Sequence, residues 1–306
     1  MRTRLILVAL LIGSSCSLGD TGRPEGARVA GSPSPSPSPT VTSEPEAPKT
    51  FAPPPERPLP HEPGRLAGEL RRVDDALKKS VQSWRTSGRA RPSTVVVLQS
   101  LYQQRIYRLM SRNTRLGNGT LRRLDGLLGR SARRIVGAHR ELRGLVEPLP
   151  ANFAFPTGRA KPAEDLLRYY KAARRRFGVN WRVLAAVNYV ETKFGKVKAT
   201  SSAGAKGPMQ FMPSTWRAYG LGGNVRNDRD AIMGAANYLS ASGATRGPAG
   251  LRRALWAYNH SGHYVRSVLA YMRYMKSRIR HYYTLYNWQV YVVTTRGDKR
   301  LTGPGL

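Results

Sequence analysis

Acidic side chains are scarce in the second half of this 306-residue chain, so each can be weighed in turn as a catalytic acid or base. Beyond position 150 the carboxylates are Glu164, Asp165, Glu191, Asp228, Asp230 and Asp298. Two pairs stand at the start of predicted helices, where acids commonly cap or stabilise the positive helix end. Asp298 falls in a predicted turn. Glu191 alone has no such structural role, which makes it the candidate for acid–base chemistry.

Glu191 lies on the apolar side of a helix predicted from Trp181 to about Lys193. Gly178 would end the helix before it, and Asn180 would cap its start. Leu184, Val187 and Glu191 are spaced three and four residues apart, which places them on one helix face. Burial there, and the negative C-terminal end of the helix nearby, would raise the pKa of the carboxyl, as a general acid near neutral pH requires. Lys193 is spaced to lie elsewhere on the helix. The periodicity equally allows a surface glutamate that follows an apolar helix.

The residues that ligate metals form no recognisable set. The histidines are His61, His139, His260, His263 and His281, and they show no metal-ligand spacing with a nearby acid or cysteine. Cys16 is the single cysteine, so no internal disulfide can form. We therefore expect neither a metal nor a cofactor.

Three sequence blocks follow one another in a fixed order. They are VET at residues 190–192, SSAGAKGPMQFMPSTW at residues 201–216 and AYN at residues 257–259. Together they resemble the soluble lytic transglycosylase pattern of a helix-borne Glu-Ser, a Gly-x-Met-Gln-x-x-Pro-x-Thr loop and Ala-Tyr-Asn. The resemblance covers about residues 162–283, and the layout of the chain resembles a secreted actinobacterial lipoprotein subgroup. It implies a lysozyme-like helical fold and an enzyme that cleaves peptidoglycan.

The resemblance assigns both proton transfers of the reaction to Glu191. Its carboxyl would protonate the glycosidic oxygen between N-acetylmuramic acid and N-acetylglucosamine. The carboxylate would then accept the proton of the C6 hydroxyl, which closes a 1,6-anhydro ring. Most glycosidases use two carboxylates, whereas no second acid is an obvious candidate here. The expected binding partner is the peptidoglycan glycan strand.

The resemblance also implies substrate-binding residues, namely Thr192, Ser201, Gly207, Met209, Gln210, Phe211, Tyr258 and Asn259. Thr192 replaces the usual serine and keeps a hydroxyl. Gly207 would let the backbone approach the glycan closely, and Gln210 would hydrogen-bond an N-acetyl or hydroxyl group. Tyr258 would hold Glu191 in position through its own hydroxyl.

Packing roles compete with several of these assignments. Met209 and Phe211 would contact a sugar face or belong to the core. Tyr258 and Asn259 would serve the site or end a helix with a buried aromatic and a capping residue. Three tryptophans could stack on sugars, but we expect core positions for all of them: Trp181, Trp216 and Trp256.

A mainly α, lysozyme-like (goose-type) fold is expected around these residues. The catalytic domain would span residues 162–285, with a last long helix from Tyr264 to about Tyr282. A small helical region at residues 64–147 would precede it, joined by a linker or crossing strap at residues 148–161. The tail at residues 286–306 could form a short β-hairpin.

Three amphipathic helices are predicted in the N-terminal helical region, because apolar residues recur there every three or four positions. Breaks are expected at residues 88–92, which run from a glycine to a proline, and at residues 117–119, which contain two glycines. Thr120 would then cap the third helix. No catalytic chemistry is evident in this region.

The N-terminus is typical of an exported protein. Arg2 and Arg4 precede a short apolar run, small residues and Cys16. This order predicts a signal peptide at residues 1–15 and a lipid attached to Cys16, although an ordinary signal peptide with an incidental cysteine fits too. Residues 16–63 are rich in proline and serine and would form an anchored linker.

Charge narrows the partners further. The chain carries 51 Lys and Arg against 18 Asp and Glu, a net charge of +33. Such a field attracts anionic polymers, and export excludes nucleic acid as the target. The expected partners are anionic cell-wall polymers and a membrane that is contacted through the lipid. The protein itself is expected to be a monomer.

Two other functions fit the sequence. A hydrolysing muramidase on the same fold would need Asp228 or Asp230 to activate water across the sugar from Glu191. A non-catalytic wall-binding lipoprotein would hold glycan without cutting it. The joint presence of Glu191, Gln210 and the AYN block argues against the second.

Overall fold

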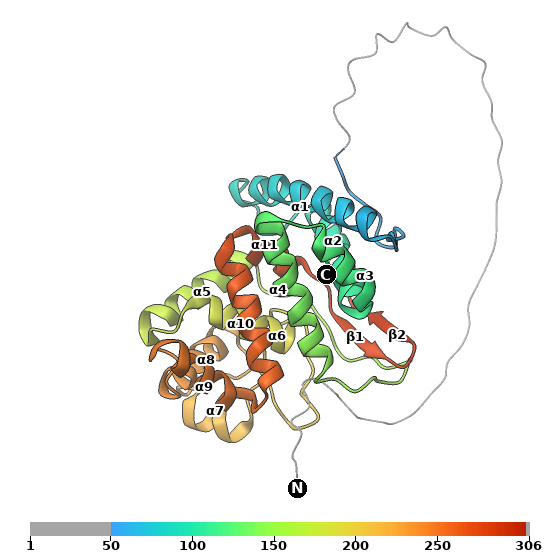
Figure 1. Ribbon diagram of the computed structural model, residues 1–306. Coiled ribbons are helices and arrows are strands. Elements are labelled where there is room, and N and C mark those ends of the chain that lie inside the picture. The colour runs from blue at the N-terminus through green and yellow to red at the C-terminus, as the bar shows by residue number, and fades with distance from the viewer. Residues whose placement is uncertain (1–49, 304–306) are drawn as a thin grey trace, which may run out of the picture. The chain divides into compact units, whose positions relative to one another are not determined.

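The computed structural model describes residues 50–303, so the predicted signal peptide, Cys16 and the linker up to residue 49 lie outside the described residues. This part of the chain is mainly α, as the sequence predicted, and ends in a two-stranded sheet (Figure 1). The helices are α1 (Pro63–Thr86), α2 (Thr94–Arg112), α3 (Thr114–Arg122), α4 (Gly126–Arg143), α5 (Ala163–Phe177), α6 (Trp181–Thr192), α7 (Pro213–Tyr219), α8 (Asp228–Ala241), α9 (Gly247–Asn259), α10 (Gly262–Ser277) and α11 (Arg280–Asn287). The strands are β1 (Tyr291–Thr294) and β2 (Gly297–Arg300).

α1 forms because its apolar residues recur on one face. Leu66, Leu70 and Val73 are fully buried on that face. Glu62 caps the helix, since its carboxylate accepts two backbone N–H bonds of 2.7 Å each. The same acid lies near the positive end of the helix dipole, which adds to the stabilisation.

A helix continues through Gly117 and Gly119, where the sequence predicted a break. Thr120 is not a cap, because it is buried inside α3 and its hydroxyl donates to the carbonyl of Leu116 at 2.8 Å. A Cβ atom on Gly117 would lie 2.1 Å from the carbonyl oxygen of Met110. The glycine is thus required by the close approach of α3 to the end of α2, and it does not break the helix.

The segment before α1 is packed against the helices although the sequence placed it in the linker. The ring of Phe51 meets the ring of Tyr102 edge-on, with centroids 5.9 Å apart. Gln99 donates to the carbonyl of Phe51 at 2.6 Å, and Arg105 donates to the carbonyls of Pro55 and Arg57 at 2.8 Å each. The part of the chain that packs on the helices therefore already includes Phe51, about a dozen residues before the predicted boundary at residue 63.

The helix that carries Glu191 is delimited as the sequence predicted. Gly178 ends α5 in the left-handed conformation, with φ of 74°. Asn180 then caps α6 by accepting the backbone N–H of Arg182 at 3.0 Å. These two residues set the start of α6, and Glu191 follows in its last turn.

The last long helix is divided in two where one continuous helix was predicted. Arg278 is extended, with φ of −156° and ψ of 138°, and separates α10 from α11. Arg280, at the start of α11, forms two hydrogen bonds of 3.0 and 2.8 Å with the carboxylate of Asp74 on α1. This paired contact directs α11 toward α1. Helical periodicity does not encode such a contact between distant helices.

The C-terminal strands form the expected hairpin. β1 and β2 are antiparallel, with Tyr291 opposite Arg300 and Thr294 opposite Gly297. The segment at residues 148–161 crosses this hairpin as a strap, because Leu149 exchanges two backbone hydrogen bonds of 2.9 Å with β1 and the residue after it.

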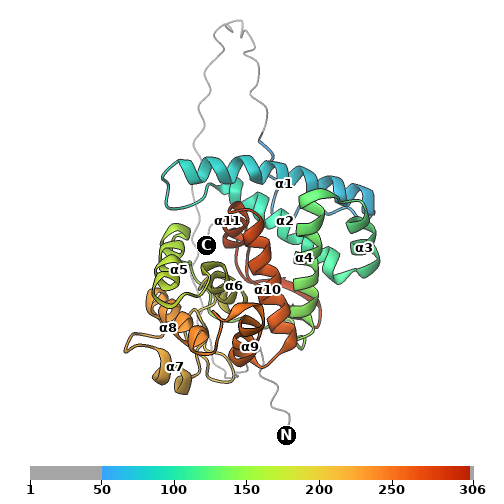
Figure 2. The same ribbon diagram turned by 60° about the vertical axis from the view of Figure 1, so that its left-hand side comes forward.

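The N-terminal helices and the predicted catalytic domain share one hydrophobic core. Leu66 of α1, Ile135 of α4, Leu184 of α6 and Val268 of α10 all belong to it. Figures 1 and 2 both show α4 running alongside α10, which in turn packs against α6. The described chain from Phe51 onward is accordingly one compact unit. No helix among residues 50–303 is long and apolar enough to cross a membrane.

Candidate active site

Glu191 is buried in the last turn of α6, with 6% of its surface exposed. One partner reaches its carboxylate from another helix, since the hydroxyl of Tyr264 on α10 donates to Oε1 at 2.7 Å. Tyr264 bonds only Oε1 and not Oε2. This hydrogen bond fixes the orientation of the buried carboxyl.

Burial raises the pKa of Glu191 to about 7. The hydrogen bond from Tyr264 and the positive charge of Lys193 each lower the pKa, but less than burial raises it. Lys193 thus acts on Glu191 electrostatically, although its helical spacing predicted a position elsewhere. A carboxyl with a pKa of about 7 exchanges its proton readily near neutral pH, which suits both an acid and a base.

Tyr258 does not make the contact with Glu191 that the sequence suggested. Its hydroxyl donates to the carbonyl of Met209 at 2.7 Å. The two tyrosine rings are parallel, with an interplanar angle of 5° and centroids 6.2 Å apart, so Tyr258 supports Tyr264 from the side. Sequence reasoning missed Tyr264 because it lies outside the three motif blocks, and no local pattern marks it.

Thr192 connects α6 to the loop that follows it. Its side chain is fully buried, and its hydroxyl donates to the carbonyl of Pro208 at 2.6 Å. The same oxygen accepts the backbone N–H of Gly195 at 2.9 Å. The residue expected to bind substrate therefore braces the loop, and its hydroxyl is already occupied by protein groups.

The loop at residues 201–211 closes on itself as a tight turn. Lys206 and Phe211 exchange two backbone hydrogen bonds of 2.9 Å. Gly207 has φ of 76°, and a Cβ atom there would lie 1.8 Å from the carbonyl oxygen of Val225. The close approach that requires this glycine is thus to the protein's own backbone, whereas the sequence suggested an approach to glycan. Gln210 also has a positive φ, 49°.

Met209 and Phe211 are core residues, with 0% and 3% of their surfaces exposed. The ring of Phe211 lies between those of Trp216 and Tyr258, with centroid distances of 5.1 and 6.1 Å. The structure therefore favours the packing alternative for both residues. Their contacts support the wall of the site, and neither side chain has surface left for contact with a sugar.

Three of the expected contact residues are either half-buried or have an unpaired polar atom. Gln210 is half-buried, and its amide nitrogen donates to the carbonyl of Gly207 at 2.9 Å. Ser201 is half-buried and its hydroxyl oxygen accepts the backbone N–H of Ala205 at 2.9 Å. Asn259 is buried, and its Oδ1 atom has no hydrogen-bond partner among the described residues. An orphaned buried acceptor of this kind can receive a hydrogen bond from a ligand.

Comparison with known protein families finds a match for the part of the chain that contains Glu191 and Tyr264. Residues 168–280 match the family model described as Transglycosylase SLT domain. These residues are a transglycosylase SLT domain. The SLT domain thus runs from α5 to the first residue of α11 and contains Glu191, Tyr264 and the loop between them.

Two relatives share one name. A membrane-bound lytic murein transglycosylase F from Thiobacillus denitrificans is 34% identical over 76 residues, which are 25% of this chain and 16% of that protein. A protein of the same description from Pseudomonas fluorescens is 34% identical over 73 residues, 24% of this chain and 15% of that protein. The chain thus spans only a small part of the length of these relatives. No solved structure matches it.

The two aspartates considered as water-activating groups have other surroundings in the SLT domain. Asn227, and not either aspartate, caps α8 with its side-chain oxygen. Asp230 accepts the backbone N–H of Asn224 at 3.0 Å. Asp228 lies against Gly195, where burial raises its pKa. Neither aspartate lines the cavity beside Glu191 that is described below.

The tryptophans divide between core and surface. Trp181 is buried, with 4% of its surface exposed, and Trp216 is half-buried. Trp256 is 49% exposed, so the expectation that it belongs to the core was wrong. It lies beside Arg252 and Arg253 in a shallow surface groove at the end of α9.

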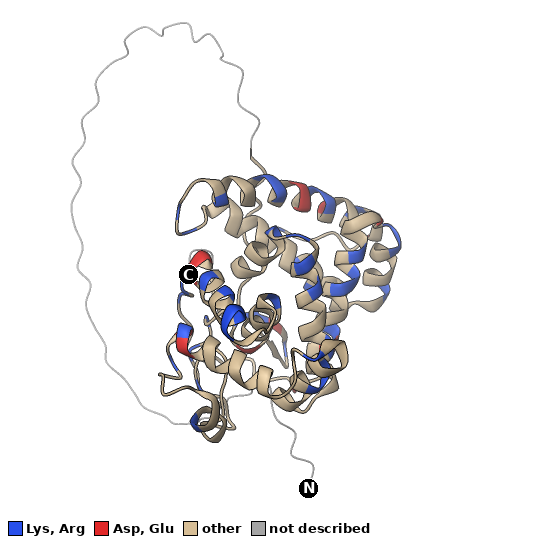
Figure 3. Cartoon of the chain, turned by 90° about the vertical axis from the view of Figure 1, so that its left-hand side faces the viewer, with Lys and Arg blue, Asp and Glu red and all other residues tan. Residues whose placement is uncertain are grey.

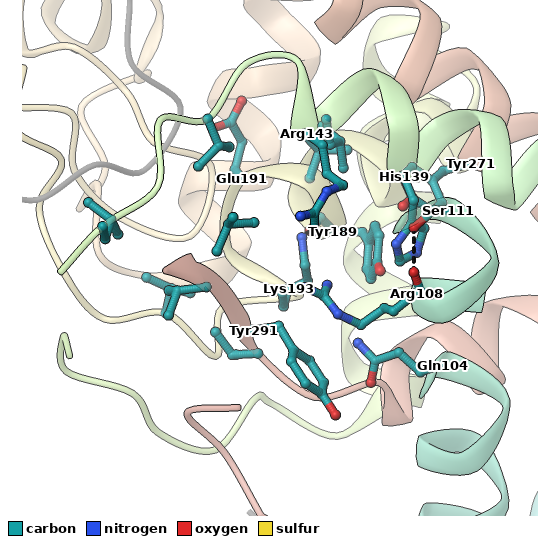
Figure 4. Close-up of a pocket in the computed structure, with 18 of the residues that line it drawn as sticks. Gln104, Arg108, Ser111, His139, Arg143, Tyr189, Glu191, Lys193, Tyr271 and Tyr291 are labelled. Atoms are coloured by element: carbon teal, nitrogen blue, oxygen red, sulfur yellow. Dashed lines mark hydrogen bonds between the residues drawn. The ribbon is translucent and has the colours of Figure 1, made fainter. Parts of the chain in front are cut away.

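A cavity of about 120 Å³ borders Glu191 (Figure 4). Its lining combines α6 of the SLT domain with elements outside residues 168–280. Arg108 comes from α2, His139 and Arg143 come from α4, and Tyr291 comes from β1. Sequence reasoning found no chemistry in the N-terminal helices, because no local motif links them to Glu191. Among residues 50–303 no group of three or more His, Cys, Asp or Glu is placed to hold a metal ion.

Proposed function

We propose that this protein is a lytic transglycosylase that cleaves the β-1,4 bond between N-acetylmuramic acid and N-acetylglucosamine in peptidoglycan. The observation that carries the proposal is the buried Glu191 of the SLT domain, whose pKa is raised to about 7 and whose Oε1 atom is held by Tyr264 at 2.7 Å. The names of the relatives, lytic murein transglycosylases, support the same reaction.

Glu191 acts as the single acid and base of the proposed reaction. The protonated carboxyl donates its proton to the glycosidic oxygen, the bond to the anomeric carbon breaks, and N-acetylglucosamine leaves with a free hydroxyl. The carboxylate then takes the proton of the C6 hydroxyl as that oxygen bonds to the anomeric carbon, which gives 1,6-anhydro-N-acetylmuramic acid. One group can do both because its pKa of about 7 leaves both protonation states accessible.

Tyr264 serves as the positioning residue for this carboxyl. Its hydrogen bond to Oε1 favours the ionised form on that oxygen, so the transferred proton resides on Oε2. Tyr258 supports Tyr264 by parallel stacking and ties α9 to the loop through Met209. The two tyrosines therefore connect the catalytic carboxyl to the loop at residues 201–211.

We assign direct substrate contact to the residues that keep accessible or unpaired polar atoms. Gln210 and Ser201 would hydrogen-bond sugar hydroxyl or N-acetyl groups from the loop, and the orphaned Oδ1 of Asn259 would accept an N–H of the glycan. Thr192, Gly207, Met209 and Phe211 support this surface from beneath. The substrate-binding set is thus smaller than the set of motif residues.

We further propose that the protein works as a monomer outside the cytoplasm. A lipid on Cys16 would attach it to the membrane, and the proline-rich segment would space it from the membrane. The relatives are named as membrane-bound enzymes. Lys and Arg are spread over most helices while Asp and Glu occur at few points (Figure 3), and the net charge is +33. This charge would retain the protein on anionic wall polymers, and salt would release it.

Mass spectrometry of the muropeptides released from purified peptidoglycan tests the reaction. The full chain should release products that end in 1,6-anhydro-N-acetylmuramic acid, one water lighter than the reducing sugar. Glu191→Gln should abolish these products while glycan binding persists, since general acid–base catalysis contributes about 10²–10⁴-fold. Reducing-end products would instead identify a hydrolysing muramidase, and no products beside an active control enzyme would favour a wall-binding protein.

A further inference from the structure

Three cationic side chains from separate elements converge on the cavity beside Glu191. The basic cavity, as we call it, is the 120 Å³ space lined by Arg108 of α2, Arg143 of α4 and Lys193 at the end of α6, together with Glu191. Figure 4 shows the ends of the three basic side chains gathered at the same place. Their elements are far apart in sequence, so the fold has brought these charges together against their mutual repulsion.

The acids around the basic cavity do not balance its positive charge. Asp298 of β2 pairs with Arg108 at 3.0 Å and with Arg143 at 2.7 Å, and it is also shared by Arg112 at 3.9 Å. Lys193 donates to the carbonyl of Tyr189 at 3.1 Å, and no carboxylate among residues 50–303 lies within ion-pair distance of it. One carboxylate thus serves three arginines while the lysine stays unpaired, which leaves the cavity attractive to an anion.

His139 gives a second, independent sign of a ligand. It lines the basic cavity with 7% of its surface exposed, and its Nε2 atom has no hydrogen-bond partner among the described residues. Burial, and then the positive charges of Arg108, Lys193 and Arg143, hold the pKa of His139 well below its usual value, so the ring is neutral. A buried nitrogen left without a partner costs free energy unless a ligand supplies one.

The size and the walls of the basic cavity restrict the anion. A space of about 120 Å³ admits a group about as large as one small amino acid. Apolar side chains complete the lining, among them Leu142, Val190, Val197 and Val290. Methyl groups would contact these walls, while a carboxylate would meet the cations. Because Glu191 also borders the cavity, its occupant would be attached to the sugar whose bond is cut.

We propose that the basic cavity binds the free carboxylate that ends a short alanine-containing peptide on the muramoyl residue next to the cleaved bond. This inference rests on the proposed function for the nature of the substrate. Arg108, His139 and Arg143 lie outside the SLT domain, so the N-terminal helices supply a specificity pocket to the catalytic carboxyl. The packing of α4 on α10, and of α2 on α4, holds that pocket in place.

A matched pair of ligands tests the proposal without any bond cleavage. N-acetylmuramoyl-L-alanine and its C-terminal amide have nearly the same shape and differ in the carboxylate charge, and neither contains a glycosidic bond between sugars. NMR titration of the full chain should give a dissociation constant about tenfold lower for the acid than for the amide, as one charge-assisted hydrogen bond provides. Equal affinities would overturn the proposal.

Two variants locate the preference and one controls for net charge. Lys193→Gln should reduce the acid-to-amide preference to less than about twofold, because the unpaired cation is gone. Arg143→Gln should act in the same direction and serves if the first variant does not fold. Arg130→Gln removes a positive charge from the exposed side of α4 and should keep the full preference. An equal loss in Arg130→Gln would mean that general electrostatics, and not the basic cavity, selects the acid.

The outcome is separable from that of the proposed function. A protein that releases anhydro products but binds acid and amide equally would keep its activity and lose the specificity pocket. A protein that prefers the acid, through Lys193, but releases no anhydro products would keep the pocket and lose the proposed reaction.

Discussion

The hydroxyl of Tyr264 donates a hydrogen bond of 2.7 Å to Oε1 of Glu191, and the two residues come from helices that start more than 80 positions apart. The bond stabilises the ionised carboxylate, whereas burial opposes ionisation more strongly and brings the pKa to about 7. The protonation of Glu191 therefore depends on a balance between desolvation and one partner, and this balance can be changed by mutation.

Tyr264→Phe should raise the pKa of Glu191 above about 7, because the hydrogen bond that lowers it is lost while burial remains. The alkaline limb of the pH–rate profile should move to higher pH, and kcat should fall by about tenfold because the carboxyl is less well oriented. Tyr258→Phe is the matched control, since that hydroxyl bonds Met209 and not Glu191. If the alkaline limb moved in Tyr258→Phe and not in Tyr264→Phe, Tyr258 would be the residue that positions Glu191.

Glu191→Gln should change how stability depends on pH. The folded pKa of about 7 lies above the unfolded value of 4.5, so stability from the protonated carboxyl is present below pH 4.5 and is lost as pH rises to 7. Glutamine stays neutral, and the variant should gain stability relative to wild type across this window, by up to about 3 kcal/mol. Urea denaturation at pH 5 and pH 8 measures the difference.

Glu141→Gln provides a control of opposite sign for that experiment. Arg266 and His263 pair with Glu141 at 2.8 and 2.7 Å, and the hydrogen bond from Arg266 holds its pKa below 4.5. Its stabilisation is present at neutral pH and is lost as pH falls below 4.5. This variant should therefore be less stable than wild type at pH 7, and the same sign of change in both variants would contradict our account of Glu191.

Gly207→Ala should destabilise the fold strongly. Its Cβ atom would lie 1.8 Å from the carbonyl oxygen of Val225, and its φ of 76° is unfavourable for alanine. We expect a loss of more than about 3 kcal/mol in the free energy of unfolding, measured by thermal denaturation. Gly204→Ala shares the positive φ of 87° but has open space around it, and it should lose only about 1 kcal/mol. Equal losses would exclude the clash with Val225 as the cause.

Thr192→Val should loosen the loop next to Glu191. The change keeps the shape of the side chain but leaves the carbonyl of Pro208 and the N–H of Gly195 without their buried partner. We expect a loss of about 2–3 kcal/mol in the free energy of unfolding and faster hydrogen exchange at Gly195. Thr192→Ser keeps the hydroxyl and should lose less than half as much. A valine variant as stable as the serine variant would show that the two bonds are unimportant.

The sequence by itself determined the features that depend on neighbouring residues. Helical periodicity placed Glu191 on a buried face, and the cap residues Gly178 and Asn180 defined the helix that carries it. The three motif blocks pointed to the SLT domain, and elimination among the acids made Glu191 the candidate for acid–base chemistry. The inferences about the helix bounds, the buried face and the domain succeed because capping, periodicity and motif spacing act over a few residues and are written in consecutive positions.

The tertiary structure alone decided the partners of Glu191 and the composition of its surroundings. It selected Tyr264 and not Tyr258 as the hydrogen-bond donor, and it kept Gly117 inside a helix that composition predicted to break. It also brought Arg108 and His139 to the cavity beside the SLT carboxyl. Such contacts depend on how helices distant in sequence pack on a shared core, and side-chain periodicity shows which face is buried but not which residues of another helix will meet it.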